Sequence, residues 1–273
     1  MTDLHRQVAD SWAALRERRP LVLCITNRVT PQRVADTLLA AGASPVMADN
    51  PHEVGQMAAI ASGIYLNTGL HETQPASLEA AARAIEDLDK PAVLDPVGAG
   101  ATAYRSGEIQ RLLESTRFTA IRGNASEIRA LAGEGAGARG VDSSDSSDSA
   151  RDAALALARS TGAIVAVSGE RDLITDGEQV VRVGGGHPWL ALITGSGCAL
   201  GALVTACVAA SDPWIGTIAA HSTFALATER AMQRSQGPGT LSIHLLDELL
   251  ALAPEDFSRA PLTPEQAVTR GRA

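Results

Sequence analysis

Short apolar runs alternate with amphipathic stretches along most of the chain. In stretches such as 4–18 and 31–41 the apolar residues recur at the spacing of one helix face, whereas runs such as 21–26 are short and continuously apolar, like buried strands. Strands are predicted at 21–26, 44–47, 64–67, 92–95, 119–122 and 163–168. Helices are predicted at 4–18, 31–41, 51–61, 77–88, 105–114, 125–131 and 150–160.

The order of these elements indicates the fold class. Alternation of strands and helices is typical of a mostly parallel sheet with helices packed on it. The segments 172–175 and 179–183, separated by an Asp-Gly-Glu turn, predict a β-hairpin. Further helices are predicted at 198–210, 214–233 and 241–250. We therefore expect a single α/β domain over residues 1–273.

Two segments of this domain are expected to be less ordered. Residues 133–149 are rich in Gly, Ser and Asp, which predicts a mobile surface loop. The tail 261–273 shows no clear periodicity and is expected to be loose.

Composition excludes several classes of function. A net charge of −8 argues against nucleic acid or an anionic membrane as a partner. No apolar run is long enough to span a bilayer, and the first residues lack the pattern of a signal peptide. The three cysteines lack metal-ligand spacing, so we expect reduced thiols and a cytoplasmic protein. The single lysine, Lys90, follows no glycine-rich loop, which excludes a Walker-type phosphate loop.

The segment 194–198 (TGSGC) directly precedes an apolar helical run and predicts an anion site. Unpaired N–H groups and the helix dipole attract anions to a helix start, and glycines let the main chain approach them closely. Cys198 would lie in the first helical turn, where a thiol pKa is lowered. The alternative that stays open is a small-residue helix start packed against a sheet.

Polar residues also follow the predicted strands, and in open α/β sheets ligands bind outside the carboxyl ends of the strands. Asp95 comes directly after an apolar strand, so it either caps a turn or lies half buried and needs a partner or a metal. Asn124 and Glu127 have the spacing of a capping box. Asp95 and Glu127 on one cleft would equally suit hydrated Mg²⁺, and Arg122 offers a forked donor for phosphate. Asn67 is explained more simply as a turn former.

Six segments together resemble the hydroxyethylthiazole kinase family: CITNRVT (24–30), LLAAGASPVMAD (38–49), LDPVGAGATAYR (94–105), IRGNASEI (121–128), ITGSGCALGAL (193–203) and GPGT (237–240). They occur in the family's order and span roughly residues 20–250. The resemblance implies a ribokinase-like three-layer αβα fold without a large lid. It also implies phosphorylation of the hydroxyl of 4-methyl-5-(2-hydroxyethyl)thiazole by ATP with Mg²⁺, in thiamine salvage, by a homotrimer with sites near the subunit interfaces.

The resemblance also assigns roles to residues at the matching positions. Contacts to the thiazole are expected from the backbone of Met47, from Gly195 and from Asn27. Contacts to ATP are expected from Arg122, Ser168, Asn124 and Gly197. Mg²⁺ would be held, directly or through water, by Asp95 and Glu127. Cys198 stands where ribokinase relatives carry an aspartate base, so it is the expected catalytic residue.

The sequence departs from the family pattern at Arg28, where the family more often has an uncharged or aromatic residue, which affects the expected pocket rim.

Other functions remain open at this point. One alternative is a hydroxymethylpyrimidine kinase. Another is a nucleotide-dependent NAD(P)HX dehydratase on the same type of fold, although those relatives usually carry Asp where Cys198 stands. A third is a binding protein for thiazole or nucleotide that performs no catalysis.

Overall fold

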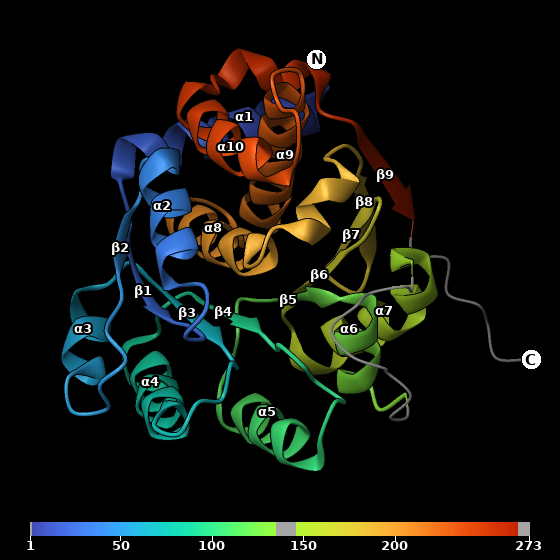
Figure 1. The fold of residues 1–273 in the computed structure, drawn as a ribbon. Helices are drawn as coiled ribbons and strands as arrows, with labels where there is room; N and C mark the ends of the chain where they lie inside the picture. Colours follow the sequence, from blue (N-terminus) through green and yellow to red (C-terminus); the bar gives the residue numbers. More distant parts are fainter. Residues whose placement is uncertain (1, 135–145, 267–273) are drawn as a thin grey trace, which may run out of the picture.

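The computed structural model describes residues 2–134 and 146–266. Within them the chain forms a nine-stranded sheet in the order β2-β1-β3-β4-β5-β6-β7-β8-β9 (Figure 1). The strands are β1 (Leu21–Ile25), β2 (Ser44–Val46), β3 (Gly63–Asn67), β4 (Ala92–Asp95), β5 (Ala120–Asn124), β6 (Ile164–Ser168), β7 (Asp172–Thr175), β8 (Gln179–Val183) and β9 (Leu262–Gln266). Pairing is parallel from β2 through β6 and antiparallel from β6 to β9. The predicted α/β class and hairpin are confirmed.

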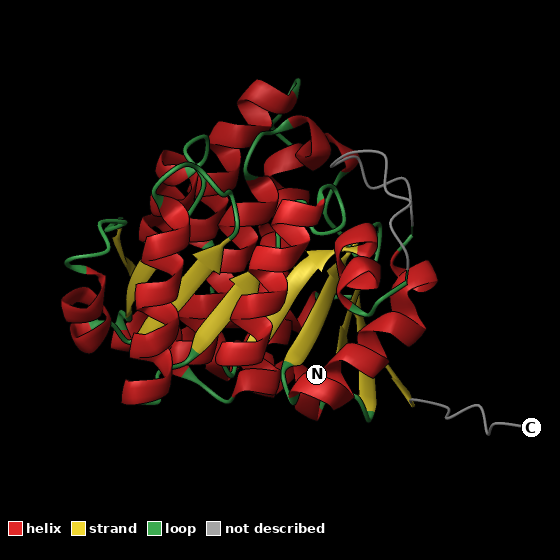
Figure 2. Cartoon of the chain, turned by 90° about the horizontal axis from the view of Figure 1, so that it is seen from below, coloured by secondary structure: helices red, strands yellow, loops and turns green. Residues whose placement is uncertain are grey.

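Helices cover both faces of this sheet, which makes three layers (Figures 1 and 2). One face carries α1 (Asp3–Arg18), α2 (Pro31–Ala41), α8 (Ser196–Ala210), α9 (Pro213–Met232) and α10 (Pro238–Ala251). The other carries α3 (Val54–Ile60), α4 (Gln74–Leu88), α5 (Ala103–Ser115), α6 (Ala125–Leu131) and α7 (Arg151–Thr161). Short 3₁₀ turns are η1 (Ser147–Ala150), η2 (Pro188–Leu192) and η3 (Pro254–Arg259).

Alternation along the strands divides the apolar core into two clusters, one on each face of the sheet. In β1, Val22 and Cys24 pack with the layer of α8, whereas Leu23 and Ile25 pack with the opposite layer. Successive side chains of a strand point to opposite faces, so a strand buried on both sides is apolar throughout. This explains why the parallel strands appear in the sequence as continuous apolar runs.

The prediction of a loose tail from residue 261 is wrong for Leu262–Gln266, which forms β9 and pairs with β8. Buried Arg182 of β8 holds it by contacting Glu265, at 3.4 Å between Nε and Oε1. The strand contains Pro264 and is largely exposed, so it lacks the alternating pattern that would reveal it. Of the predicted loop 133–149, residues 135–145 lie outside the described residues, as do 267–273 of the tail, while Ser147–Ala150 forms η1.

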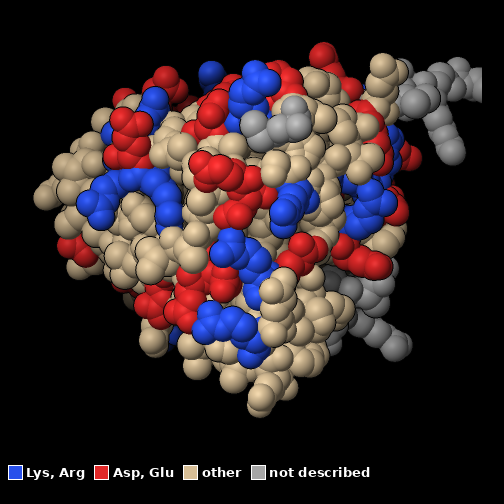
Figure 3. All heavy atoms as spheres, turned by 90° about the horizontal axis from the view of Figure 1, so that it is seen from above, with Lys and Arg blue, Asp and Glu red and all other residues tan. Residues whose placement is uncertain are grey.

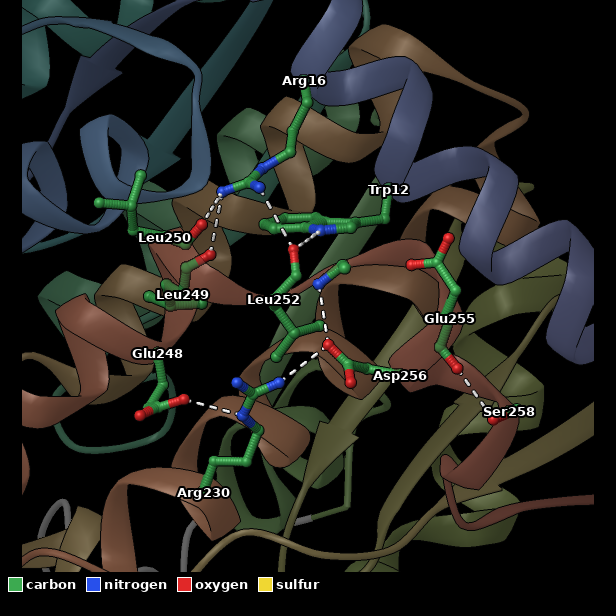
Figure 4. A network of polar contacts seen from close by, with 11 residues as sticks. Trp12, Arg16, Arg230, Glu248, Leu249, Leu250, Leu252, Glu255, Asp256 and Ser258 are labelled. Carbon is green, nitrogen blue, oxygen red and sulfur yellow. Dashed lines mark hydrogen bonds and ion pairs between the residues drawn. The ribbon is translucent and has the colours of Figure 1, made fainter.

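A polar network fixes the helical layer that carries α8 (Figure 4). Trp12 and Arg16 of α1 both donate to the carbonyl of Leu252 just after α10, at 3.1 and 3.2 Å. Arg230 of α9 donates to Glu248 of α10 at 2.8 Å. These contacts hold three helices of one face together. The residues joined between α1 and the end of α10 are more than two hundred positions apart in the sequence.

The surface shows no large separation of charge on the face seen in Figure 3, where acidic and basic side chains are interspersed among uncharged residues. Within the described part of the chain, the helices are too short or too polar for one of them to cross a bilayer.

Candidate active site

The strand register brings the central polar residues together. β3 and β4 are parallel, with Tyr65 beside Val93 and Asn67 beside Asp95. Because side chains alternate along a strand, Tyr65, Asn67 and Asp95 lie on one face of the sheet, and that face is covered by α8. Cys198 lies in the first turn of α8 at the carboxyl edge of the sheet, so strand ends and helix start meet there.

Five side chains form one hydrogen-bonded cluster at this point. Tyr65 donates its hydroxyl to Asp95 Oδ2 at 2.6 Å, and the Asn67 amide donates to the same oxygen at 3.0 Å and to Cys198 Sγ at 3.3 Å. Asn27 donates to Asn67 Oδ1 at 3.2 Å and to Cys198 Sγ at 3.4 Å. The structure thus joins the predicted residues Asn27, Asp95 and Cys198 through two residues, Tyr65 and Asn67, that the sequence had not marked as functional.

Asp95 is held in an environment that disfavours its charge. Only 1% of its surface is exposed, and this burial raises the pKa of its carboxyl, although Arg122, Tyr65 and Asn67 act in the opposite direction. Its second oxygen, Oδ1, is buried and has no hydrogen-bond partner among the described residues. A buried carboxylate oxygen without a partner is costly, so this atom indicates a place for a ligand.

The pKa of the Cys198 thiol is raised, whereas its position at a helix start had predicted a lowered pKa. Burial raises its pKa, and the nearby charge of Asp95 raises it further. Hydrogen bonds from Thr30 and Asn27 and the charge of Arg122 oppose this only in part. The thiol is therefore protonated near neutral pH in the free protein, because desolvation and the charge of Asp95 outweigh the groups that favour the thiolate.

The start of α8 requires its glycines. Gly195 precedes the helix at φ +81°, and a Cβ there would lie 2.6 Å from Thr30 Cγ2. At Gly197 a Cβ would lie 2.8 Å from Nη1 of Arg122. No side chain of the described residues caps this helix, so the amides of Gly197 and Cys198 in its first turn are available to a ligand.

Arg122 of β5 lies directly under this helix start. It is buried and donates to the hydroxyl of Ser168 at 2.5 Å, at the end of neighbouring β6. Burial alone lowers the pKa of its guanidinium, but the charges of Asp95, Glu127 and Asp172 outweigh that effect and raise it. The guanidinium therefore stays charged, with its Nε unpaired among the described residues.

Asn124 and Glu127 form the capping box that their spacing predicts. Glu127 Oε2 accepts the amide of Asn124 at 2.9 Å, and Asn124 Oδ1 accepts the amide of Glu127 at 2.9 Å. Glu127 Oε1 also accepts the amide of Gly98 at 3.0 Å, which ties the loop after β4 to α6. Burial and the charge of Asp95 raise the pKa of Glu127.

The two carboxylates of Asp95 and Glu127 are better suited to a hydrated Mg²⁺ ion than to a metal ion coordinated by protein side chains alone. Within the described residues, no three or more His, Cys, Asp or Glu side chains gather as a metal site. Mg²⁺ typically keeps several waters and takes one or two carboxylates together with substrate phosphates. The unpartnered Oδ1 of Asp95, whose charge lies close enough to raise the pKa of Glu127, meets that requirement.

Met47 lies apart from this cluster. It follows β2, one edge strand of the sheet, and 36% of the residue's surface is exposed. Its side chain takes no part in the contacts described above, and the expected contact of its backbone with the thiazole stays a prediction.

The three-layer fold, with its polar cluster at the strand ends, is of the ribokinase-like class. A ribokinase-like superfamily protein from Enterococcus faecalis shares the fold at a TM-score of 0.60 and 15% identity. A solved hydroxyethylthiazole kinase protein from Pyrococcus horikoshii is more similar, with a TM-score of 0.88 and 35% identity over 95% of this chain and 99% of that one.

Sequence comparison shows the family. The hydroxyethylthiazole kinase family matches residues 12–255. The chain is 48% identical over 249 residues to the hydroxyethylthiazole kinase of Clavibacter sepedonicus, covering 90% of each chain. It is 40% identical over 272 residues to that of Desulfotalea psychrophila, covering 99% of this chain and all of the other. This chain belongs to the hydroxyethylthiazole kinase family.

Proposed function

We propose that this chain transfers the γ-phosphoryl group of ATP to the hydroxyl of hydroxyethylthiazole, a reaction of thiamine salvage. The observation that carries the proposal is the hydrogen-bonded cluster that places the Cys198 thiol and the buried Asp95 carboxylate at the uncapped start of α8. Phosphoryl transfer requires mainly positioning and charge neutralisation, and these groups supply both.

The start of α8 would bind the transferring phosphoryl group. The amides of Gly197 and Cys198, aided by the helix dipole, are donors for its oxygens. A preorganised donor of this kind lowers the barrier by roughly 3 kcal/mol. Arg122, held by Ser168, would bind the phosphates of ATP from below. Asn124 would contact ATP from the end of β5, with its side-chain oxygen engaged in the cap of α6.

Asp95 and Glu127 would hold Mg²⁺, directly or through water. When bound, the ion supplies positive charge that neutralises the phosphates. The role of the protein is to keep both carboxylates fixed: Asp95 Oδ2 accepts two hydrogen bonds, and each Glu127 oxygen accepts a backbone amide.

In its neutral thiol form, Cys198 would orient the substrate hydroxyl. Because its pKa is raised, little of the side chain is thiolate near neutral pH, so Cys198 is poorly suited to act as a general base. In a loose transition state the attacking hydroxyl needs alignment more than early loss of its proton, and a thiol can provide that.

Asn27, Gly195 and Met47 would contact the thiazole. Asn27 donates to Cys198 Sγ at 3.4 Å, which supports its proposed position beside the reacting hydroxyl. Met47 is exposed directly after the edge strand β2, and this supports a homotrimer in which a neighbouring subunit completes the substrate pocket. The three free cysteines support a reducing, cytoplasmic location.

The test is release of ADP by the purified protein with hydroxyethylthiazole, hydroxymethylpyrimidine or no alcohol, each with Mg²⁺ and with a chelator. We expect release that depends on both hydroxyethylthiazole and Mg²⁺. Faster turnover of hydroxymethylpyrimidine would favour the pyrimidine kinase. Conversion of hydrated NADH, which a parallel assay would follow, would favour the dehydratase. Binding of the thiazole alcohol without ADP release would leave only a binding protein.

A further inference from the structure

Gly201 leaves a recess in α8 that the ring of Tyr65 fills. A Cβ at position 201 would lie 2.8 Å from Tyr65 Cε2, 3.1 Å from its hydroxyl oxygen and 3.2 Å from Asp95 Oδ2. Gly201 lies inside a helix, where alanine would be the more stable residue in the absence of such a contact. The glycine therefore accommodates the phenol and the carboxylate together.

The hydroxyl of Tyr65 has a specific partner in this recess. The side chain is completely buried, and its 2.6 Å bond to Asp95 Oδ2 has the length of a charge-assisted hydrogen bond. An apolar side chain would satisfy a buried strand position at lower desolvation cost, so the hydroxyl is explained by its acceptor.

The two oxygens of Asp95 are in unequal environments as a result. Oδ2 accepts from both Tyr65 and Asn67, whereas Oδ1 is buried without a partner among the described residues. Rotation of the carboxylate would break both bonds to Oδ2. The contacts therefore select one orientation of Asp95.

We propose that Tyr65, seated against Gly201, is a positioning residue that fixes the Asp95 carboxylate and keeps Oδ1 free for the Mg²⁺–nucleotide complex. The inference rests on the proposed role of Asp95 in holding Mg²⁺. Tyr65 itself touches neither metal nor substrate and acts through Asp95.

The first test is Tyr65→Phe, which removes the hydroxyl and keeps the ring. The matched control is Tyr104→Phe, since Tyr104 is the second of the two tyrosines and lies 57% exposed on α5. Binding of Mn²⁺, as a probe for Mg²⁺, is measured by electron paramagnetic resonance in the presence of a non-hydrolysable ATP analogue. Loss of a hydrogen bond to a charged group predicts about tenfold weaker Mn²⁺ binding and about tenfold lower kcat. The KM for hydroxyethylthiazole should not change.

The second test pushes on the same ring from the helix. Gly201→Ala should weaken Mn²⁺ binding as Tyr65→Phe does, because the new methyl group collides with the phenol. In a Tyr65→Ala background the ring is absent and only the 3.2 Å approach of the new methyl group to Asp95 Oδ2 remains, so adding Gly201→Ala should weaken Mn²⁺ binding by much less than it does beside the ring, a non-additive result expected for residues in contact.

Four outcomes decide the proposal. Wild-type Mn²⁺ affinity and kcat in folded Tyr65→Phe would overturn it, and so would equal effects of Gly201→Ala with and without the ring. Asp95→Asn separates the inference from the proposed function. If Asp95→Asn binds Mn²⁺ normally, the metal role of Asp95 fails and the inference fails with it. If Asp95→Asn loses Mn²⁺ but Tyr65→Phe does not, the inference alone is wrong.

Discussion

Replacing Gly195 with alanine should abolish most phosphoryl transfer without unfolding the protein. Gly195 adopts φ +81° before α8, and the new Cβ would stand 2.6 Å from Thr30 Cγ2 and 3.0 Å from Thr30 Cβ. The left-handed conformation costs an alanine about 1–2 kcal/mol. This cost affects stability, whereas the collision affects the position of the helix start.

The size of the effect on activity follows from the collision. Carbon atoms pack at about 3.5–4.0 Å, so Thr30 and the turn at residue 195 must separate by about 1 Å. A misplacement of about 1 Å reduces a rate by roughly 100-fold when it affects groups that position the reactants. We therefore expect kcat of Gly195→Ala to fall by roughly two orders of magnitude.

The control is Gly162→Ala at the end of α7. Gly162 has φ +72°, and no described atom lies within 4 Å of the position that its new methyl group would occupy, so it reports the backbone cost without the collision. Steady-state ADP release and thermal unfolding are measured for both variants. Thr30→Ser in the Gly195→Ala background removes the nearest methyl and keeps the hydroxyl that contacts Thr26 at 3.2 Å, so it should restore part of kcat. Equal kcat for Gly195→Ala and Gly162→Ala would refute the reasoning.

Three further predictions concern the charged and thiol groups. Cys198→Ala should lower kcat by about tenfold, the worth of one orienting hydrogen bond, with the KM for ATP unchanged; full turnover would remove the thiol from the mechanism. Arg122→Lys loses the forked guanidinium that would bind phosphate and its hydrogen bond to Ser168, so the KM for ATP should rise about tenfold while that for the thiazole alcohol stays constant in steady-state assays. Asp95→Asn should abolish activity yet raise the unfolding temperature of the metal-free protein at neutral pH. Because the pKa of Asp95 is raised in the folded protein, folding favours its protonated form, and this contribution to stability is lost as pH rises through the folded pKa. Asparagine carries no charge at any pH, so calorimetry should show that the gain in unfolding temperature of Asp95→Asn shrinks toward acid pH. A lower unfolding temperature than wild type at neutral pH would contradict this.

Much of the architecture could be predicted from periodicity, because strands buried on both faces are continuously apolar and the helices are amphipathic. The capping box of Asn124 and Glu127 was likewise predictable, since it depends on residues three apart. β9 was not predictable, because an exposed strand that contains a proline has neither a continuous apolar run nor an amphipathic pattern. It depends on Arg182, a residue distant in sequence.

Asn67 and Tyr65 show where prediction from sequence ends in the candidate site. At the end of an apolar strand, Asn67 has the same local pattern as a turn residue. Its function as a donor follows from the register that puts it beside Asp95, and that register depends on how two strands pair. Tyr65 has the pattern of a core aromatic unless Gly201 is known to pack against it.

The same long-range packing explains why the thiol pKa was misjudged and what the site requires of its ligands. A helix start lowers the pKa of an exposed thiol, but the cluster buries Cys198 beside Asp95, and desolvation dominates. Asp95 and Glu127 also have raised pKa values, although Arg122 lies near both. Two buried carboxylates facing one guanidinium disfavour negative charge in the free protein. A divalent cation would relieve this, and the amides at the start of α8 would receive the phosphates that accompany it. On the proposed function, the site would bind metal and nucleotide as one complex, each making the other's binding more favourable.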